Sequence, residues 1–318
     1  MKDLHCKNCG GAMLPNSTAM VAECLYCGTT YLLEQEDTAY YREFFGQMSS
    51  RLSDTECPKP KSRVKTKTQV FSCADGSSMR VEYLYRYSHR EADVYVAAGA
   101  VVYHFRKQGM EQAEHYERVS SSLDFPSEDV RNLEQFFPKI VSRRRLKDGT
   151  YVMVIRKGED EYPLRLFGAL DGRHVAWIIS RLENICCVLE YNGLVHPEIS
   201  VDSVYINPHT HQAFLYGDWW SAGRLYSMPE GRKEPLSSED SLIALRDTAA
   251  ALLGFADRTN VWAGAYIPEA LAAFVSGEPC EDAYEDFALW DETLIKAYGE
   301  RKFVKLEVDE KQLYDGTK

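Results

Sequence analysis

From residue 69 onward, apolar and polar residues alternate in short segments separated by turn-forming residues. Such alternation is typical of strands that bury one face. Asp75-Gly76 and Ala98-Gly99 each lie between two of these segments, which indicates β-hairpins. The predicted strands cover residues 69–73, 79–87, 93–98, 100–106, 136–143 and 150–156, and a helix is expected over 111–123.

Beyond Pro163 the pattern changes to that of amphipathic helices. Apolar residues at 175, 178, 179, 182 and 189 fall on one face of a predicted helix over 174–191, and Gly193 is placed to end it. Further helices are predicted over 238–255, 268–276 and 282–298. A β-rich half followed by a helical half predicts an α+β fold of two lobes with a cleft between them.

Four of the nine cysteines form two Cys-x-x-Cys-Gly motifs, Cys6/Cys9 and Cys24/Cys27. Four thiolates in this spacing are the ligands of a closed, tetrahedral Zn²⁺ site. We therefore expect residues 1–33 to form a zinc ribbon that contains a β-hairpin over 13–23, with zinc as its structural cofactor. So small a unit cannot bury a large core, and the metal should supply most of its folding energy.

The residues after the ribbon resemble a connection more than a domain. Apolar residues at helical spacing predict a short amphipathic helix within 33–48. Residues 49–67 are rich in Ser, Pro and Lys and are expected to be a linker. The segment 34–67 is therefore interpreted as a short helix and a linker.

The net charge of −11 is unevenly distributed. Residues 196–318 contain 11 Lys and Arg against 22 Asp and Glu, whereas residues 1–195 are balanced at 26 of each. This makes the C-terminal half a poor surface for nucleic acid and a candidate surface for a basic protein partner. Two basic clusters interrupt the balanced half and are interpreted as solvated: Lys59, Lys61, Arg63, Lys65 and Lys67, and Arg143, Arg144, Arg145 and Lys147.

No apolar run is long enough to span a bilayer, and no signal peptide opens the chain. Nine cysteines without a secretory signal do not indicate a disulfide framework. We therefore expect a cytoplasmic protein without a membrane segment.

The segment after Gly193 contains His196-Pro197-Glu198 and, after two short apolar runs, Asp218-Trp219. These motifs resemble the His-Arg-Asp and Asp-Phe-Gly motifs of the protein kinases. The resemblance extends over about residues 79–303: 92–96 resembles the strand that leaves the glycine loop, 227–230 resembles Ala-Pro-Glu, and Asp240 stands where the family has a buried structural Asp. More narrowly, the chain resembles small phage and bacterial kinase-like proteins.

The resemblance implies a bilobal protein kinase-like fold, with the N-lobe over 68–162, the C-lobe over 163–306 and a tail over 307–318. It also implies roles for individual residues. His104 takes the position of the nucleotide-binding Lys, with Arg106 as an out-of-phase substitute, and Glu114 or Glu117 takes that of the helix Glu. Glu198 takes the position of the catalytic base, Ser200 that of a Lys, Ser203 that of the Asn metal ligand, and Asp218 that of the Mg²⁺-binding Asp.

Most of these positions depart from what phosphoryl transfer needs. The loop 87–94 contains no glycine, His104 is shorter than Lys, and only Asp218 is retained. The sequence therefore predicts a pseudokinase that acts as a protein-binding or regulatory module. The alternative is an active, atypical Ser/Thr kinase that uses Mg-ATP, with Glu198 as base and Asp218 on Mg²⁺. A nucleic-acid factor that uses the ribbon and the Lys59–Lys67 cluster is a third hypothesis.

Other conspicuous residues have structural interpretations. Trp219 and Trp220 are expected to fill the core between the lobes, and Cys186 and Cys187 to pack inside a helix. His209 and His211 are expected to lie in a hairpin turn.

Overall fold

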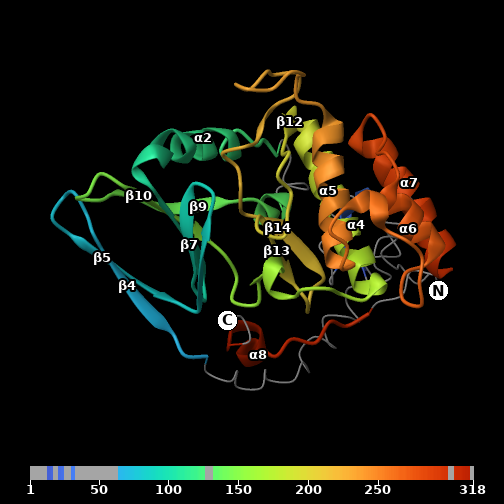
Figure 1. Ribbon diagram of the computed structural model, residues 1–318, viewed down its shortest axis with the longest axis horizontal. Coiled ribbons are helices and arrows are strands. Elements are labelled where there is room, and N and C mark those ends of the chain that lie inside the picture. The colour runs from blue at the N-terminus through green and yellow to red at the C-terminus, as the bar shows by residue number, and fades with distance from the viewer. Residues whose placement is uncertain are drawn as a thin grey trace.

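The computed structural model describes residues 13–16, 21–24, 30–32, 64–125, 132–299 and 304–315. From residue 64 onward, the described residues form a sheet lobe and a helical lobe that lie side by side (Figure 1). This is the bilobal α+β architecture expected from the sequence. Among the described residues, no helix is both long enough and apolar enough to cross a membrane.

The N-terminal strands form a small antiparallel sheet of their own. β1 (Met13–Asn16) pairs with β2 (Val21–Cys24), which confirms the predicted hairpin, and β2 pairs with β3 (Thr30–Leu32). Cys6, Cys9 and Cys27, the side chain of Cys24, the predicted helix within 33–48 and most of the linker lie outside the described residues.

The sheet lobe contains a five-stranded antiparallel sheet in the order β6-β7-β8-β10-β9. Its strands are β6 (Tyr85–His89), β7 (Ala92–Val96), β8 (Ala100–Phe105), β9 (Lys139–Arg145) and β10 (Tyr151–Arg156). A separate hairpin of β4 (Lys67–Ser72) and β5 (Ser78–Tyr83) turns at Asp75-Gly76.

The single strand predicted over 79–87 is in fact two strands, β5 and β6. Leu84 lies between them, and its N–H donates to the carbonyl of Val96 at 2.8 Å. β5 pairs with β4, whereas β6 pairs with β7, so the chain changes sheets at this residue. Alternation continues through the break, which is why the pattern alone did not reveal it.

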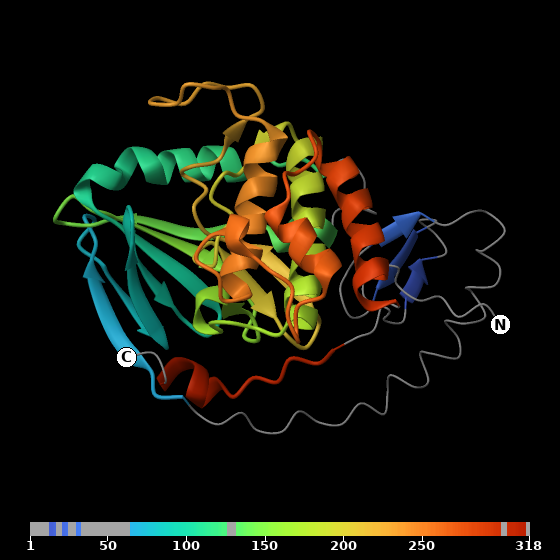
Figure 2. The same cartoon turned by 45° about the vertical axis from the view of Figure 1, so that its right-hand side comes forward.

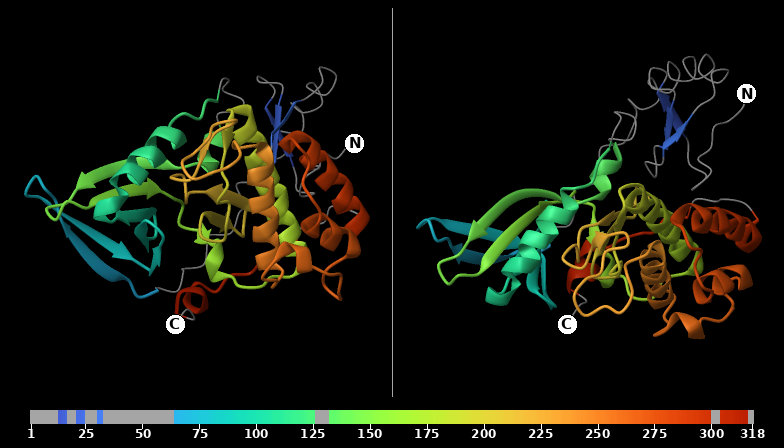
Figure 3. Two further views of the ribbon diagram at one scale, coloured as in Figure 1. Left: turned by 45° about the horizontal axis from the view of Figure 1, so that its top comes forward. Right: turned by 90° about the horizontal axis from the view of Figure 1, so that it is seen from above.

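The two faces of the five-stranded sheet are covered by different elements. One face, which includes Val101, Tyr103 and Phe105, packs against α2 (Met110–Ser120) and the helical lobe. The other face, which includes Val102, packs against the β4–β5 hairpin. Figure 3 shows α2 lying along the sheet. Because strand residues alternate between faces, a shift of one position decides which core a side chain enters.

The helical lobe is built on α4 (Gly172–Tyr191), which packs against α5 (Ser238–Leu252) and α7 (Ala283–Tyr298). α6 (Glu269–Ser276) lies between α5 and α7. Asp171 caps the start of α4, and Gly193, at φ 61°, follows its end as predicted. The Arg246 guanidinium donates to Asp286 at 2.6 Å in the interior of this lobe.

The loops of the helical lobe that face the sheet lobe are connected by short strands. β13 (Val204–Asn207) pairs with β14 (Gln212–Leu215) and with β11 (Tyr162–Pro163), and β12 (Leu194–Val195) pairs with β15 (Gly223–Arg224). Residues 196–203 and 216–222, which contain the kinase-like motifs, follow β12 and β14. The hairpin therefore brings the two motifs to the same end of the lobe.

The C-terminal segment returns to the connection between the lobes. The carbonyl of Val304 contacts the His211 ring at 2.7 Å, and the Tyr162 hydroxyl donates to Glu310 of α8 (Glu310–Asp315) at 2.7 Å. Tyr314 packs on Tyr162, with ring centroids 6.3 Å apart. Figures 1 and 2 both show α8 at the lower side of the molecule, near the start of β4.

Candidate functional site

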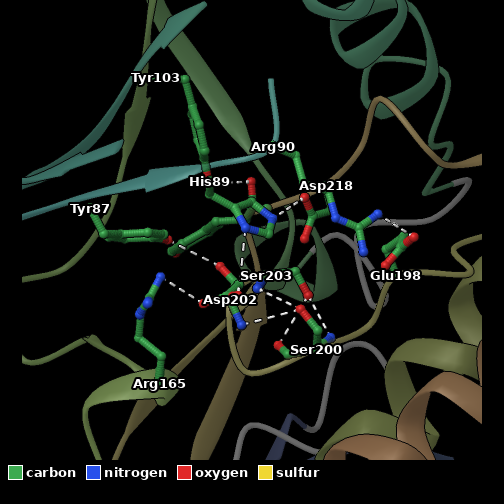
Figure 4. Close-up of polar contacts among 12 residues, drawn as sticks. Tyr87, His89, Arg90, Tyr103, Arg165, Glu198, Ser200, Asp202, Ser203 and Asp218 are labelled. Carbon is green, nitrogen blue, oxygen red and sulfur yellow. Dashed lines mark hydrogen bonds and ion pairs between the residues drawn. The ribbon is translucent and has the colours of Figure 1, made fainter. Parts of the chain in front are cut away.

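The turn between β6 and β7 lies over the kinase-like motifs of the helical lobe. His89 ends β6, and Arg90 adopts a positive φ of 36°, which is uncommon for a residue other than glycine. Both side chains point away from their sheet and toward the loops that contain Glu198, Asp202 and Asp218 (Figure 4). The side chains of the turn thus enter the space between the lobes.

Asp218 is the centre of this cluster. It follows β14 at φ 58°, is 1% exposed, and contacts the Nε2 atom of His89 through Oδ1 at 2.8 Å. Burial raises the pKa of Asp218, although the hydrogen bond from His89 opposes this shift. The other carboxylate oxygen of Asp218, Oδ2, is buried and has no hydrogen-bond partner among the described residues.

His89 lies between two carboxylates. Its Nδ1 atom is 3.5 Å from Oδ2 of Asp202, and Asp202 also pairs with Arg165 at 2.8 Å. Burial lowers the pKa of His89, but the hydrogen bond and charge of Asp218 outweigh burial, so the pKa is raised. The imidazolium form is therefore the form that this site stabilises.

Replacing His89 with glutamine should flatten the alkaline side of the pH–stability curve. A raised histidine pKa stabilises the folded protein below the unfolded value of about 6.5, and this stability is lost as the pH rises through the higher folded pKa. As the pH rises above about 6.5, we expect the wild type to lose more stability than the variant.

Urea unfolding at a series of pH values measures this difference. His209→Gln is the matched control, because His209 is exposed at the β13–β14 turn and should leave the slope unchanged. Equal slopes in the wild type and His89→Gln would show that the His89–Asp218 pair contributes nothing to the pH dependence of stability.

Glu198, at the position of the catalytic base, pairs with Arg90 from the same turn. The Arg90 side chain is 51% exposed and the Glu198 side chain 28% exposed, so the pair contributes little stability. Its consequence is geometric, because the guanidinium occupies the space in front of the Glu198 carboxylate. A substrate hydroxyl could reach Glu198 only after Arg90 had moved.

The position expected for the nucleotide-binding Lys faces the wrong way. His104 lies on the hairpin side of the sheet, where its ring packs on Phe71 and its Nε2 atom is 2.9 Å from the Thr150 hydroxyl. The neighbouring residue, Tyr103, faces the helical lobe and donates from its hydroxyl to the carbonyl of Tyr216 at 3.2 Å. The side chain next to His104 that faces the helical lobe is therefore a Tyr bonded to backbone.

The acidic partner expected on α2 is also absent from the interior. Glu114 is exposed, and Glu117 pairs with Arg143 of β9. Tyr116 faces inward instead, and its hydroxyl donates to the carbonyl of Tyr216 at 2.5 Å. Tyr103 and Tyr116 thus share one carbonyl acceptor, in place of an ion pair between the strand and the helix.

The paired tryptophans fill the space beside Asp218. Trp219 is fully buried, donates to the carbonyl of Leu215 at 2.9 Å and packs against His196. Trp220 contacts Tyr103, Tyr116 and two further rings, with centroid distances of 5.7–6.2 Å. This agrees with the core-filling role expected for both residues.

The two serines at kinase-like positions bond to each other's backbone. The N–H of Ser200 donates to the Ser203 hydroxyl at 2.8 Å, and that hydroxyl is 3.2 Å from the Ser200 carbonyl. Ser203 is fully buried, and a side chain at Gly217 would lie 2.5 Å from its Cα atom. Ser203 therefore closes a turn, and its oxygen is already used there.

Two other expected roles change in the structure. Asp240 is partly exposed: it completes the capping box of α5 with Ser237 and pairs with Arg232 at 2.7 Å. Ser241, the next residue, accepts the N–H of His196 at 2.9 Å. The polar anchor beneath the first motif is thus Ser241 in place of the expected buried Asp. Glu230, in the segment likened to Ala-Pro-Glu, is exposed.

His196 and His211 are buried neutral histidines. His196 contacts the carbonyl of Gly217 at 3.0 Å, and burial lowers its pKa to about 4. Burial likewise lowers the pKa of His211, at the β13–β14 turn, to about 4. Over residues 64–125, 132–299 and 304–315, no group of three or more His, Cys, Asp or Glu side chains is arranged to hold a metal ion.

Sequence reasoning did not identify five residues that shape this site: His89, Arg90, Tyr103, Tyr116 and Asp202. A signal for the first two was present, because two cationic residues replace the glycines of a loop that faces acidic motifs. Tyr103 and Tyr116 could not be identified in the same way, because which residues of β8 and α2 face inward depends on the register of the sheet.

No protein-family model matches the sequence. No curated protein matches it either. The structure, however, is similar to one titled "Structure of vaccinia related kinase 3", with a TM-score of 0.51 and 13% sequence identity. The match covers 77% of this chain and 94% of the other. At this identity the likeness is one of fold, and the chain has a bilobal fold similar to that of the protein kinases.

Proposed function

We propose that the protein is a pseudokinase that acts as a protein-binding or regulatory module. The observation that carries this proposal is that basic side chains of the chain itself pair with the carboxylates at the kinase-like positions. His89 contacts Asp218 and Asp202, and Arg90 contacts Glu198. In an active kinase such carboxylates hold Mg²⁺ and accept the substrate proton, so they must be accessible.

The loss of the strand cation supports the same proposal. Phosphoryl transfer depends on positioned positive charge around the transferred group. Tyr103 of β8 and Tyr116 of α2 face the helical lobe, and neither carries a charge. Both hydroxyls donate to the carbonyl of Tyr216. Glu198 as base and Asp218 on Mg²⁺ remain the alternative, which requires the β6–β7 turn to open.

Thermal unfolding with Mg-ATP tests the proposal. A ligand that binds the native state raises Tm, and a concentration of 100 times Kd adds about 2.7 kcal/mol. We expect no rise at millimolar Mg-ATP, and no phosphate transfer to the protein itself or to a general protein substrate. A rise in Tm together with phosphotransfer that Asp218→Ala abolishes would establish the active alternative. Mg²⁺ alone is the matched control.

We also propose that Cys6, Cys9, Cys24 and Cys27 hold one structural Zn²⁺. The support is the paired Cys-x-x-Cys-Gly spacing, together with the hairpin of β1 and β2 that lies between the two cysteine pairs. We expect about one zinc per chain by atomic absorption, and loss of the metal in Cys6→Ser/Cys9→Ser. Cys186→Ser, a change inside α4, should retain it. Metal-free wild-type protein, purified without chelator, would contradict this proposal.

A further inference from the structure

Among the described residues, no strand lies along most of the outer edge of β9. β9 is the last strand in the order β6-β7-β8-β10-β9 and pairs with β10 on its inner side. On its outer side, within the part of the chain that the structure describes, one backbone bond is made, from the N–H of Ala74 to the carbonyl of Arg145 at 2.9 Å. An edge of this kind can pair with another chain.

An open groove runs beside this edge. It has a volume of about 710 Å³ and is bounded by residues 138–143 on one side and by Glu117 and Ser120 of α2 on another. Val141, near the middle of the strand, is 47% exposed at the groove. An added strand would lie about 4.8 Å from β9, and Val141 would then give it an apolar contact.

The edge is strongly basic on both faces of the sheet. Arg143 pairs with Glu117 on the α2 side, and Arg144 lies 3.6 Å from Asp75 on the hairpin side. Both arginines are about half exposed, so these pairs are weak and can exchange for the carboxylates of a partner. Arg145 and Lys147 are exposed and form no ion pair with the described residues.

The charge selects among the chains that could pair with this edge. A second copy that paired through β9 would place arginine against arginine, which is unfavourable. A nucleic acid would use the charges but would leave the backbone edge and Val141 without a role. An extended acidic peptide uses all three features: the backbone N–H and C=O groups, the exposed Val141, and the cations on both faces.

We infer that the outer edge of β9, residues 139–145, binds an acidic protein segment in extended conformation as an added strand. This inference rests on the proposed function, because it names the partner class of the binding module. It does not involve the cleft, so Mg-ATP binding and peptide binding can succeed or fail separately.

Fluorescence anisotropy with the full-length protein tests the inference. The probes are labelled decapeptides in which Glu alternates with Val or Thr. Matched peptides carry N-methyl groups on alternate backbone nitrogens, which keeps the charge and side chains but removes the donors. We expect the unmodified peptides to bind, and N-methylation on the edge that faces β9 to weaken binding at least about tenfold, as loss of backbone pairing requires.

Substitutions locate the site on the protein. Arg145→Glu with Lys147→Glu should weaken the peptide complex about tenfold, since it replaces attraction by repulsion. Arg80→Glu is the matched control: Arg80 is exposed on β5, outside the groove, and its substitution should leave binding unchanged. If the double variant does not fold, the comparison of methylated and unmodified peptides on the wild type decides alone.

Three results would overturn the inference. No binding by any of the acidic peptides would exclude the interaction. Equal binding of the methylated peptides would show attraction by charge alone, without strand addition. Tighter binding of a ten-nucleotide DNA strand, with a steep dependence on salt, would identify the edge as a nucleic-acid surface.

Discussion

Replacing Asp286 with alanine is expected to lower the free energy of unfolding by about 3–5 kcal/mol, because it leaves the buried Arg246 guanidinium without its counter-ion. Both side chains are at most 1% exposed, and Asp286 also accepts the N–H of Cys280 at 2.8 Å. Glu183 lies beside them, and burial together with the charge of Asp286 raises its pKa. The substitution thus breaks a polar cluster that water does not reach.

Chemical unfolding monitored by circular dichroism measures this loss. Glu292→Ala on the same helix is the matched control, since its pair with Lys296 is exposed on both sides and should contribute at most about 0.5 kcal/mol. A similar, small effect for both substitutions would mean that Arg246 is stabilised by its bonds to backbone carbonyls alone.

Protonation of two buried histidines between pH 7 and pH 4 should destabilise the protein by several kcal/mol. His196 and His211 are buried, and their pKa values fall to about 4 in the folded state. A lowered histidine pKa gives stability that is present above the unfolded value of about 6.5 and lost as the pH falls through the folded value. A shift of this size is on the order of 3 kcal/mol for each residue.

The variant that isolates this effect is His211→Asn. His211 has a φ of 53°, which asparagine tolerates better than most residues. At pH 7 the variant should lose about 1 kcal/mol with the bond to Val304, whereas between pH 7 and pH 4 it should lose less than the wild type. Unfolding curves at both pH values give the comparison, with exposed His209→Asn as control. An unchanged acid slope would contradict it.

The elements of this fold are largely visible in the sequence because their periods are regular. The helix over 174–191 was predicted to within two residues of α4. Its apolar face shows which side packs against the core, and Gly193 shows where the helix ends. The break at Leu84 was missed because β5 and β6 have the same alternation but different partners. Pairing between strands is a long-range property that a local pattern does not contain.

The site was predictable in its motifs and not in its contacts. Asp218 and Glu198 were identified, but the histidine that contacts Asp218 is 129 residues away in sequence. His104 was expected to face the kinase-like motifs but lies on the hairpin side of the sheet, and in a strand one position is the difference between two faces. The resemblance to kinases identified the residues of the motifs, but the direction of each side chain depends on how the sheet packs.

Several contacts join the sheet lobe to the helical lobe. Tyr87 donates to the carbonyl of Asp202, His89 contacts Asp218, and Tyr103 and Tyr116 share the carbonyl of Tyr216. Opening the lobes as a hinge would break all of these contacts together and would expose Trp220. We therefore expect the opening motion by which two-lobed enzymes admit and release ligands to be costly in this molecule.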